Sequence, residues 1–371
     1  MSMIIDGTNG CTFPDTTVQT TTGKTGFVNR IINGSMVIDQ RYSGALITSP
    51  TTYMIDRWNV NTNQSARLNA RQNYNSVTPP AGFSNYLGIV STGAATVGST
   101  DYSQLQQNIE GFNTADLGWG TANAKTVTLS FWVYSSLTGT FSGSFRDAST
   151  YSYAYPFSYT ISSANTWTYI SITVPGPTAG IGTWGTTNGI GIQMLFNLGC
   201  GSTYLSSANS WQAGVYAGVT GSVNVVATNG ATWYVTGVQL EKGSTATSFD
   251  YRPYGTELAL CQRYYWVAQS GAYVPLTCGS IFNNQTTTIL ALITFPVPMR
   301  TSGTLISTTG TNIYAFSRNG TADYFNSFSQ DMSSTTFTDL YNSTEISGTA
   351  GQPGVCYGVD ATSKVAFSAE L

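Results

Sequence analysis

The stretch KTVTLSFWVYSS, residues 125–136, decides the fold class because its side chains alternate with a period of two residues. Val127, Leu129, Phe131 and Val133 share one face of the segment if it is extended. Small polar residues and two aromatic residues occupy the other face. A segment of this kind is typical of a half-buried β-strand, with one face in a core and the other outside it.

The same alternation returns in WTYISITVPG (167–176), GIGIQMLFNLG (189–199) and SKVAFSAEL (363–371). The stretch DYSQLQQNIEGF (101–112) fits either a helix or a strand, and we predict a strand because its neighbours are sheet-like. Turn residues separate these segments, as they do in a β-sandwich or a barrel. The sequence therefore predicts an all-β protein.

One short helix is the exception. After Thr256, which we predict as the N-cap, Leu258, Cys261, Gln262 and Tyr265 recur at helical spacing. We expect this helix to follow the larger group of strands.

The composition restricts the function. Charged residues make up 8% of the 371 residues, against about 25% in an ordinary soluble domain. The chain contains no histidine, which excludes catalytic triads with an imidazole base and histidine-ligated metal sites. Five cysteines at irregular spacings indicate reduced, mostly buried thiols in a cytosolically made protein, rather than a disulfide framework or a zinc site.

Several partners are also unexpected. The net charge of −3 and the lack of a basic block argue against nucleic acid. The longest apolar run, ILALITFPVPM (289–299), is shorter than the ~20 residues of a membrane span, so we expect no membrane insertion. We also expect no cofactor, and the first ten residues carry no signal-peptide pattern.

The few charges are unevenly placed. No charged residue occurs in 148–240 or in 264–299, yet six occur in GVQLEKGSTATSFDYRPYGTELALCQRYY (237–265). We call these six charged residues the charge belt, and the arrangement of the domains has to account for it.

Several motifs together resemble those of bacteriophage tail-fibre and related virion proteins. They are DGTNGCTFPDTTVQT (6–20), NRIINGSMVIDQR (29–41), MIDRW (54–58), IEGFNTADLGWG (109–120), VTLSFWV (127–133), TGVQLEKGSTATSFDYRPYGTELALCQRYY (236–265) and AFSAEL (366–371). The resemblance implies a carbohydrate-binding-module type jelly-roll sandwich at 29–255, followed by a smaller β-sandwich domain at 256–371. It also implies a short N-terminal segment, 1–28, that attaches the chain to the virion or forms a stem.

The charge belt would then lie where the chain passes from one sandwich to the other. We predict that it is an inter-domain clasp that pairs strand ends and backbone groups left unsatisfied at such a seam. The clasp residues are Glu241, Asp250, Arg252, Glu257 and Arg263, and the belt would extend to Asp56 and Arg57. The alternative is a charged ligand site.

Three tryptophans are the glycan candidates: Trp119, Trp184 and Trp211. All three stand in Gly-, Ser-, Thr- and Asn-rich contexts that are typical of loops, and an indole ring can stack on the apolar face of a sugar. A surface rich in amides and poor in charge favours a neutral glycan. Core packing or a subunit contact is the alternative for each ring.

Catalysis and metal binding are less supported. Glu110, Asp116 and Asp147 are the nearest approach to an acid/base set for glycan cleavage, but turn formation explains them as well, and we expect no enzyme. Jelly rolls resembling this one often hold a structural calcium ion between the first and last strands. Asp39 could serve in the first strand, but Thr236 and Gly237 stand where acidic residues are common in the last, so the metal stays unknown.

The function expected from these observations is a virion structural protein that assembles in the host cytoplasm, a tail fibre or fibre-like component that contacts a host cell-surface glycan. A homotrimer is expected, with 1–28 contacting other virion proteins. The alternative is a capsid or tail cement or decoration protein that binds no sugar, and a weaker alternative is a glycan-cleaving enzyme.

Overall fold

The computed structural model describes residues 28–50, 52–64, 67–94, 96–147, 150–281 and 286–371. Near the N-terminus it also gives a three-stranded antiparallel sheet in the order β1 (Ile4–Asp6), β2 (Gly10–Thr12), β3 (Val18–Gln19). Apart from these strands and Val28, the predicted attachment or stem segment, 1–28, lies outside the described residues.

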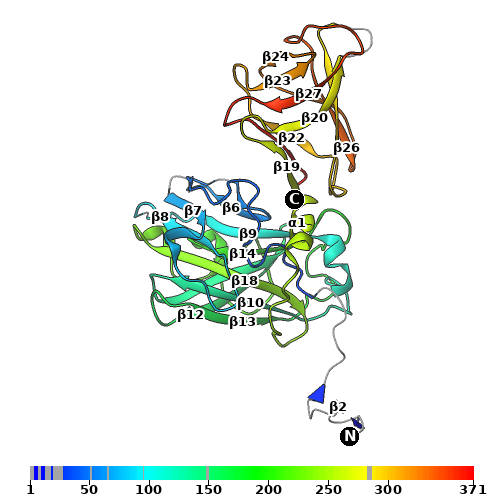
Figure 1. Cartoon of the computed structure of the whole chain (residues 1–371). Coiled ribbons are helices and arrows are strands. Elements are labelled where there is room, and N and C mark those ends of the chain that lie inside the picture. Colours follow the sequence, from blue (N-terminus) through cyan, green and yellow to red (C-terminus); the bar gives the residue numbers. More distant parts are fainter. Residues whose placement is uncertain are drawn as a thin grey trace.

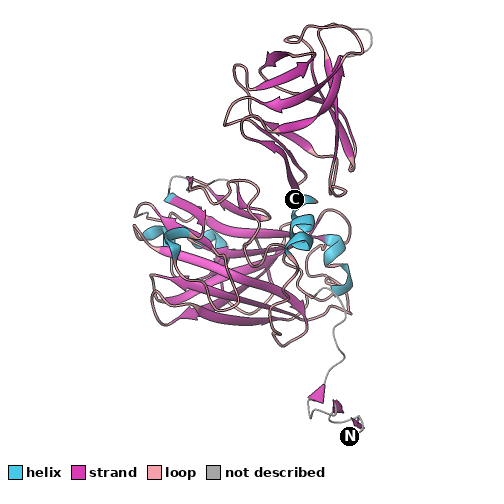
Figure 2. Cartoon of the chain, viewed as in Figure 1, coloured by secondary structure: helices cyan, strands magenta, loops and turns pink. Residues whose placement is uncertain are grey.

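Two bodies built of strands make up the described chain (Figures 1 and 2). The first is a sandwich of two antiparallel sheets, a six-stranded one and a seven-stranded one. The six-stranded sheet has the order β13 (Thr168–Val174), β10 (Val127–Ser135), β18 (Thr232–Lys242), β8 (Leu87–Ser91), β7 (Leu68–Gln72), β4 (Ile47–Thr48). The seven-stranded sheet has the order β16 (Gln212–Ala213), β12 (Tyr153–Ile161), β11 (Gly139–Arg146), β14 (Ile190–Asn197), β9 (Ser103–Glu110), β6 (Trp58–Thr62), β5 (Tyr53–Ile55). The predicted jelly-roll sandwich is confirmed.

Short elements connect these strands. A parallel pair joins β15 (Leu205–Ser206) to β17 (Gly218–Val219). Within the described residues, single turns of 3₁₀ helix lie in the connections at η2 (Tyr74–Ser76), η3 (Gly111–Asn113), η4 (Ala115–Leu117), η5 (Ser202–Tyr204) and η6 (Val225–Ala227).

Strand β10 shows why the sequence pattern produces this sandwich. Leu129, Phe131 and Val133 are fully buried in the core between the two sheets. Phe131 meets Phe196 of the opposite sheet edge-to-face, with 5.0 Å between ring centroids. The other face carries Trp132 and Tyr134, which are half-buried. Each of the four stretches chosen for period-two alternation contains a strand, and so does 101–112, which forms β9.

The smaller body is also a β-sandwich. Its three-stranded sheet has the order β19 (Tyr265–Ser270), β28 (Lys364–Ser368), β22 (Thr304–Ser307). Its seven-stranded sheet has the order β24 (Thr321–Phe325), β23 (Tyr314–Arg318), β27 (Pro353–Gly358), β20 (Pro275–Ile281), β21 (Ile289–Thr294), β26 (Phe337–Asn342), β25 (Ser329–Ser333). A separate core of buried residues, including Phe295, Phe316 and Phe367, fills this body.

Helix α1 (Tyr254–Gln262) confirms the predicted helix, but its predicted ends are wrong. It begins three residues earlier than an N-cap at Thr256 predicts, directly after Pro253, whose carbonyl oxygen accepts the backbone N–H of Thr256 at 2.9 Å. Proline fits there because it has no backbone N–H that would need a partner. Tyr265 belongs to β19 instead, because Tyr264 ends the helical turn and packs with Cys261 and Ile32 in a small buried cluster.

The predicted clasp residues lie along this connection without forming a single cluster. Arg252 makes an ion pair with Glu257 at 3.0 Å and also bonds the backbone carbonyls of Asn29 and Ile31. These contacts fasten helix α1 to the first segment of the large sandwich. The other two acids of the predicted set have different partners. Glu241 accepts the backbone N–H and the hydroxyl of Thr247, and Asp250 accepts the backbone N–H groups of Val28 and Asn29.

Arg263 reaches across to the large sandwich. Its Nη2 and Nε donate to the two carboxylate oxygens of Glu110, at the end of β9, at 2.6 and 2.9 Å. Tyr264 donates its hydroxyl to the same carboxylate. Burial alone would raise the pKa of Glu110, but these hydrogen bonds and the positive charge of Arg263 outweigh it, so the pKa is lowered.

The contacts between the two bodies also involve an acid that the predicted clasp omitted. Glu370, just after β28, pairs with Arg41 at 2.6 Å and with the fully buried Arg57. Arg300 donates to the backbone carbonyls of Ala369 and Glu370, at 2.7 Å each. In Figure 1 the C-terminal end accordingly lies beside α1, between the two bodies.

Replacing Arg263 with alanine should destabilise the protein by about 1–3 kcal/mol, because Glu110 is only 2% exposed and would lose both its ion pair and two hydrogen bonds. Urea unfolding at pH 7, followed by tryptophan fluorescence, measures the change. Lys242→Ala is the matched control, since Lys242 and its partner Asp116 are 47% and 52% exposed and such pairs contribute about 0–1 kcal/mol. Equal losses in the two variants would contradict this account.

The same pair predicts a pH dependence. A carboxylate whose pKa is lowered by folding stabilises the protein above the pKa of an unfolded glutamate, about 4.3, and this stabilisation is lost as the pH falls. The difference in unfolding free energy between wild type and Arg263→Ala should therefore shrink between about pH 6 and pH 3. A difference that stays constant over this range would show that Glu110 is not the group that Arg263 stabilises.

Candidate functional site

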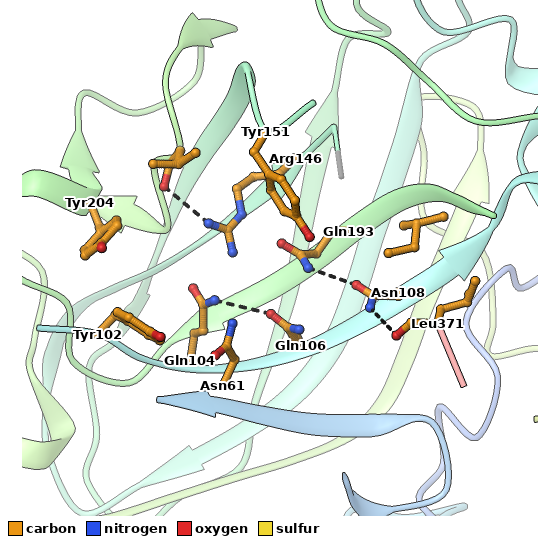
Figure 3. Close-up of a pocket in the computed structure, with 12 residues that line it drawn as sticks. Asn61, Tyr102, Gln104, Gln106, Asn108, Arg146, Tyr151, Gln193, Tyr204 and Leu371 are labelled. Carbon is orange, nitrogen blue, oxygen red and sulfur yellow. Dashed lines mark hydrogen bonds between the residues drawn. The ribbon is translucent and has the colours of Figure 1, made fainter. Parts of the chain in front are cut away.

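A hollow of about 510 Å³ lies on the face of the seven-stranded sheet that points away from the core of the large sandwich (Figure 3). We call it the amide groove. Strands β6, β9, β11 and β14 supply its floor, and connections supply its rim. It is lined by Asn61, Tyr102, Gln104, Gln106, Asn108, Arg146, Tyr151, Ile190, Gln193, Tyr204, Val215 and Leu371.

The amides face the groove because of the period of β9. Leu105 and Ile109 point into the core, so Gln104, Gln106 and Asn108 point to the opposite face. The antiparallel register then extends the amide surface sideways. It sets Asn61 of β6 opposite Gln104 and Gln193 of β14 opposite Asn108.

Hydrogen bonds among the amides fix their orientation. Gln104 Nε2 donates to Gln106 Oε1 at 3.2 Å, and Gln193 Nε2 donates to Asn108 Oδ1 at 2.9 Å. Asn108 Nδ2 donates to the carbonyl oxygen of Leu371 at 3.0 Å. Gln193 Oε1 is buried and accepts no hydrogen bond from the described residues. The groove thus offers oriented amide groups with hydrogen-bonding capacity left over.

Tyrosines form much of the apolar lining. Tyr102 and Tyr204 meet edge-to-face, with 5.5 Å between ring centroids, and pack on a small buried cluster that contains Leu195 and Cys200. Tyr151, on the rim, is 45% exposed. These rings give the groove flat apolar surfaces next to its amides.

Arg146, in β11, is the cation of the groove. It is 6% exposed, and its Nη1 donates to the carbonyl oxygen of Val215 at 3.3 Å. Nε is buried and has no acceptor among the described residues. Burial lowers the pKa of Arg146 to about 10, although Tyr151, Tyr204, Cys200 and Asp147 each act in the opposite direction. In Figure 3 the guanidinium group points into the space between the tyrosines and the amides.

The three acids considered for catalysis are separated and engaged elsewhere. Glu110 pairs with Arg263, and Asp116 pairs with Arg30 at 2.7 Å and with Lys242 at 3.4 Å. The Asp147 carboxylate accepts five hydrogen bonds, from Thr150, Ser152 (two), Tyr153 and Thr183. It ties the rim loop that carries Tyr151 to the loop that carries Trp184. None of the three lines the amide groove.

The three candidate tryptophans come together in one cluster. Ring centroids lie 4.8 Å apart for Trp119 and Trp184, 5.5 Å for Trp119 and Trp211, and 5.3 Å for Trp184 and Trp211, all edge-to-face. Each indole N–H donates to a backbone carbonyl at 2.8 Å. Trp119 is 7% exposed and packs on the core, while the other two are half-buried. The sugar-stacking prediction therefore applies chiefly to Trp184 and Trp211.

A second hollow of about 340 Å³ lies on the outer face of the six-stranded sheet. Aromatic rings line most of it, including Phe83, Trp132, Tyr169, Phe249 and Tyr251. No charged side chain contributes to the described lining, so this aromatic hollow contrasts with the amide groove.

The position considered for a calcium ion, between the first and last strands, does not gather carboxylates. Asp39 accepts the backbone N–H groups of Tyr42 and Gly44 and so closes a turn. Gly237 has φ of 62°, and a Cβ there would lie 2.6 Å from the ring of Phe83, so a larger ligand residue would not fit without a shift. Over the described residues, no group of three cysteine or acidic side chains could hold a metal ion. No helix in that part of the chain is long and apolar enough to span a membrane.

Comparison with known proteins identifies no family. No family model matches the chain, and no curated protein matches it. The sandwich region is similar to the enzymatically active domain of bacteriophage CBA120 tailspike protein 4, with 12% identity over 58% of this chain and 22% of that one, at a TM-score of 0.32. It is also similar to a putative sugar-binding protein from Bacteroides thetaiotaomicron (12% identity, 58% and 100% covered, TM-score 0.33) and to TmCBM61 in complex with β-1,4-galactotriose (8% identity, 58% and 99% covered, TM-score 0.29). At these values none of these proteins' functions carries over to this chain.

The reasoning from sequence missed the amide groove. A signal was present in 101–112, where Gln104, Gln106 and Asn108 fall on the face opposite to that of Leu105 and Ile109 if the segment is extended. That alternation was sufficient to predict a strand, and a strand with long amides on its outward face is also a candidate binding surface. Arg146 gave no comparable signal, because its burial depends on residues far away in the chain, including Val215 and Tyr204.

The tryptophan cluster predicts a graded loss of stability. Trp119→Ala should destabilise the protein by about 3–5 kcal/mol, because it removes a buried indole on which two other indoles pack. Trp184→Ala should cost less, since its ring is half-buried. Phe112→Ala is the control, because Phe112 is 60% exposed, and thermal unfolding of the three variants gives the order. A loss at Phe112 as large as that at Trp119 would contradict this assignment.

Proposed function

We propose that this chain is a non-enzymatic, carbohydrate-binding component of a bacteriophage virion and that the amide groove binds a host cell-surface glycan. The observation that carries the proposal is the groove itself: five amide side chains and three tyrosines converge on one hollow of about 510 Å³. This volume is within the range of about 300–1,000 Å³ that is usual for small-ligand sites.

The chemistry of the lining suits a sugar. A sugar ring has apolar C–H faces and a rim of hydroxyl groups, and each hydroxyl both donates and accepts hydrogen bonds. Tyr102, Tyr151 and Tyr204 can pack on the faces. Amides carry both donors and acceptors, and those in the groove are held in place by one another, so little side-chain entropy is lost on binding.

The absence of catalysis is part of the proposal. Hydrolysis of a glycosidic bond ordinarily requires two carboxyl groups on either side of that bond. The described lining of the amide groove includes no aspartate or glutamate side chain, and Glu110, Asp116 and Asp147 are each engaged in ion pairs or hydrogen bonds elsewhere. A role in binding is therefore favoured over cleavage.

The virion role rests on the sequence resemblance to tail-fibre proteins. In this proposal the chain assembles into the virion in the host cytoplasm, residues 1–28 contact other virion proteins, and the groove faces the host. The contacts proposed for 1–28 lie outside the described residues.

The groove proposal predicts a loss of binding in the double variant Gln104→Ala/Gln106→Ala. Each lost hydrogen bond contributes about 0.5–1.5 kcal/mol, so affinity for the glycan should fall at least about fivefold. Adsorption of fluorescently labelled full-length protein to host cells, together with a printed glycan array, measures this. Asn229→Ala, in an exposed turn, is the matched control. Wild-type protein that adsorbs to no cell and to no glycan would favour the cement or decoration role instead.

A homotrimer is the second part of the proposal. Three copies on one axis would present several grooves to one surface and so raise the avidity of weak sites. Static light scattering of the purified full-length protein should give three times the 39.6 kDa of the chain. A monomeric or dimeric mass at micromolar concentration would contradict the three-fold assembly.

A further inference from the structure

We propose that the amide groove selects a sugar that carries a negative charge, and that Arg146 is the residue that recognises the charged group. The shared chemistry is an anionic substituent on a sugar ring, either the carboxylate of an acidic sugar or a sulfate ester. This inference rests on the proposed function, because it assigns the ligand class of the same groove. It also replaces the expectation of a neutral glycan.

The comparison among buried arginines carries the argument. Two arginines of the described chain are less than a tenth exposed as whole residues, Arg57 and Arg146. Arg57 is paired with the carboxylate of Glu370. Arg146 forms no ion pair with any described residue, and its one hydrogen bond goes to the carbonyl of Val215. Arg252 and Arg318, whose side chains are 5% and 7% exposed, both have carboxylate partners.

The surroundings of Arg146 contain no free counter-charge. Of the groups that act on its charge, Tyr151 and Tyr204 offer hydroxyl groups and no carboxylate, and burial raises the pKa of the Cys200 thiol to about 11, so that this thiol stays neutral at pH 7. The remaining one, Asp147, is the next residue in the chain. Its two oxygens are occupied by five donors of the rim loops. The carboxylate therefore serves the loops and does not cap the guanidinium group.

Burying an unpaired guanidinium is unfavourable, because the group loses water and gains no anion in return. The lowered pKa of Arg146 reflects this, although the group stays protonated at neutral pH. An anion that enters the groove offsets this unfavourable burial. It supplies the missing counter-charge in a place already shielded from water, where a charge-assisted hydrogen bond is roughly twice as strong as a neutral one.

The groove also offers contacts for the ring and the hydroxyl groups of such a sugar. Figure 3 shows the guanidinium group of Arg146 pointing into the hollow, with Gln104 and Gln193 on one side and Tyr204 and Tyr151 around it. A charged substituent directed at Arg146 leaves the ring next to the tyrosines and its hydroxyls next to the amides. Gln193 Oε1, buried and without a donor, lies in the same wall.

The test uses a printed panel in which each sugar is present in a neutral and an acidic form, such as galactose and galacturonate oligomers, with sulfated and sialylated oligosaccharides added. Full-length wild-type protein should bind an anionic member at least about tenfold more tightly than its neutral counterpart, as expected of one charge-assisted contact. A carboxylate and a sulfate ester are distinguished by which arm binds best. In Arg146→Met this preference should fall to less than about twofold.

Stability supplies an independent readout. Because Arg146 is buried without an anionic partner, Arg146→Met should leave the melting temperature unchanged or raise it, whereas Arg57→Met should lower it, since Glu370 loses one of its two arginine partners. A loss in Arg146→Met as large as that in Arg57→Met would overturn the premise that Arg146 is unpaired.

The outcomes separate the two proposals. Wild type that binds neutral and acidic sugars equally, with binding lost in Gln104→Ala/Gln106→Ala, overturns the anionic inference and leaves the proposed function standing. A preference for acidic sugars that persists in Arg146→Met also overturns it. Trp132→Ala, in the aromatic hollow, should keep the preference for acidic sugars. If this variant lost the preference, the binding site would lie in the aromatic hollow and not in the amide groove. Wild type that binds no sugar on the panel overturns both proposals.

Discussion

Strand β9 has to satisfy opposite environments on its two faces, and much of the large sandwich depends on that constraint. Leu105 and Ile109 complete the core, while three amide side chains on the opposite face of the strand build the floor of the groove. At its end, Glu110 holds Arg263 and Tyr264 of the connection to the second sandwich. A slip of one residue in register would turn amides into the core and leucine into the groove. The alternation of side chains along β9 therefore determines the core, the binding surface and the connection between the domains.

The sequence predicted most of what depends on local pattern. The alternation in 125–136 and its relatives identified strands correctly, because a half-buried sheet imposes period two on any segment it contains. The helix was found, but Thr256 is not its N-cap, since Pro253 suits the first turn as well and lies closer to the end of the preceding loop. Such boundaries depend on which neighbouring residues become buried, here Cys261 and Tyr264.

The candidate site could be predicted less well from the sequence, because its contacts join residues that lie far apart in the chain. Glycine-rich contexts around tryptophans are typical of loops, yet Trp119 is buried beneath two other indoles that lie far away in the sequence. The charges of the connection stand out in the sequence as a group, but their partners do not. Arg57 and Arg41 pair with Glu370, more than 300 residues away, and no local pattern reports a contact over that separation.

The contact between Asn108 and Leu371 has a thermodynamic consequence. Asn108 belongs to the groove, whereas the segment of Leu371 also carries Glu370, which is held by Arg41 and Arg57. Ligand binding in the groove and docking of the second sandwich therefore both involve the side chain of Asn108. Any ligand that strengthens or weakens the hydrogen bond from Asn108 changes the docking equilibrium by the same free energy by which docking changes the affinity for that ligand. Ligand binding in the groove and docking of the second sandwich are in this sense linked equilibria.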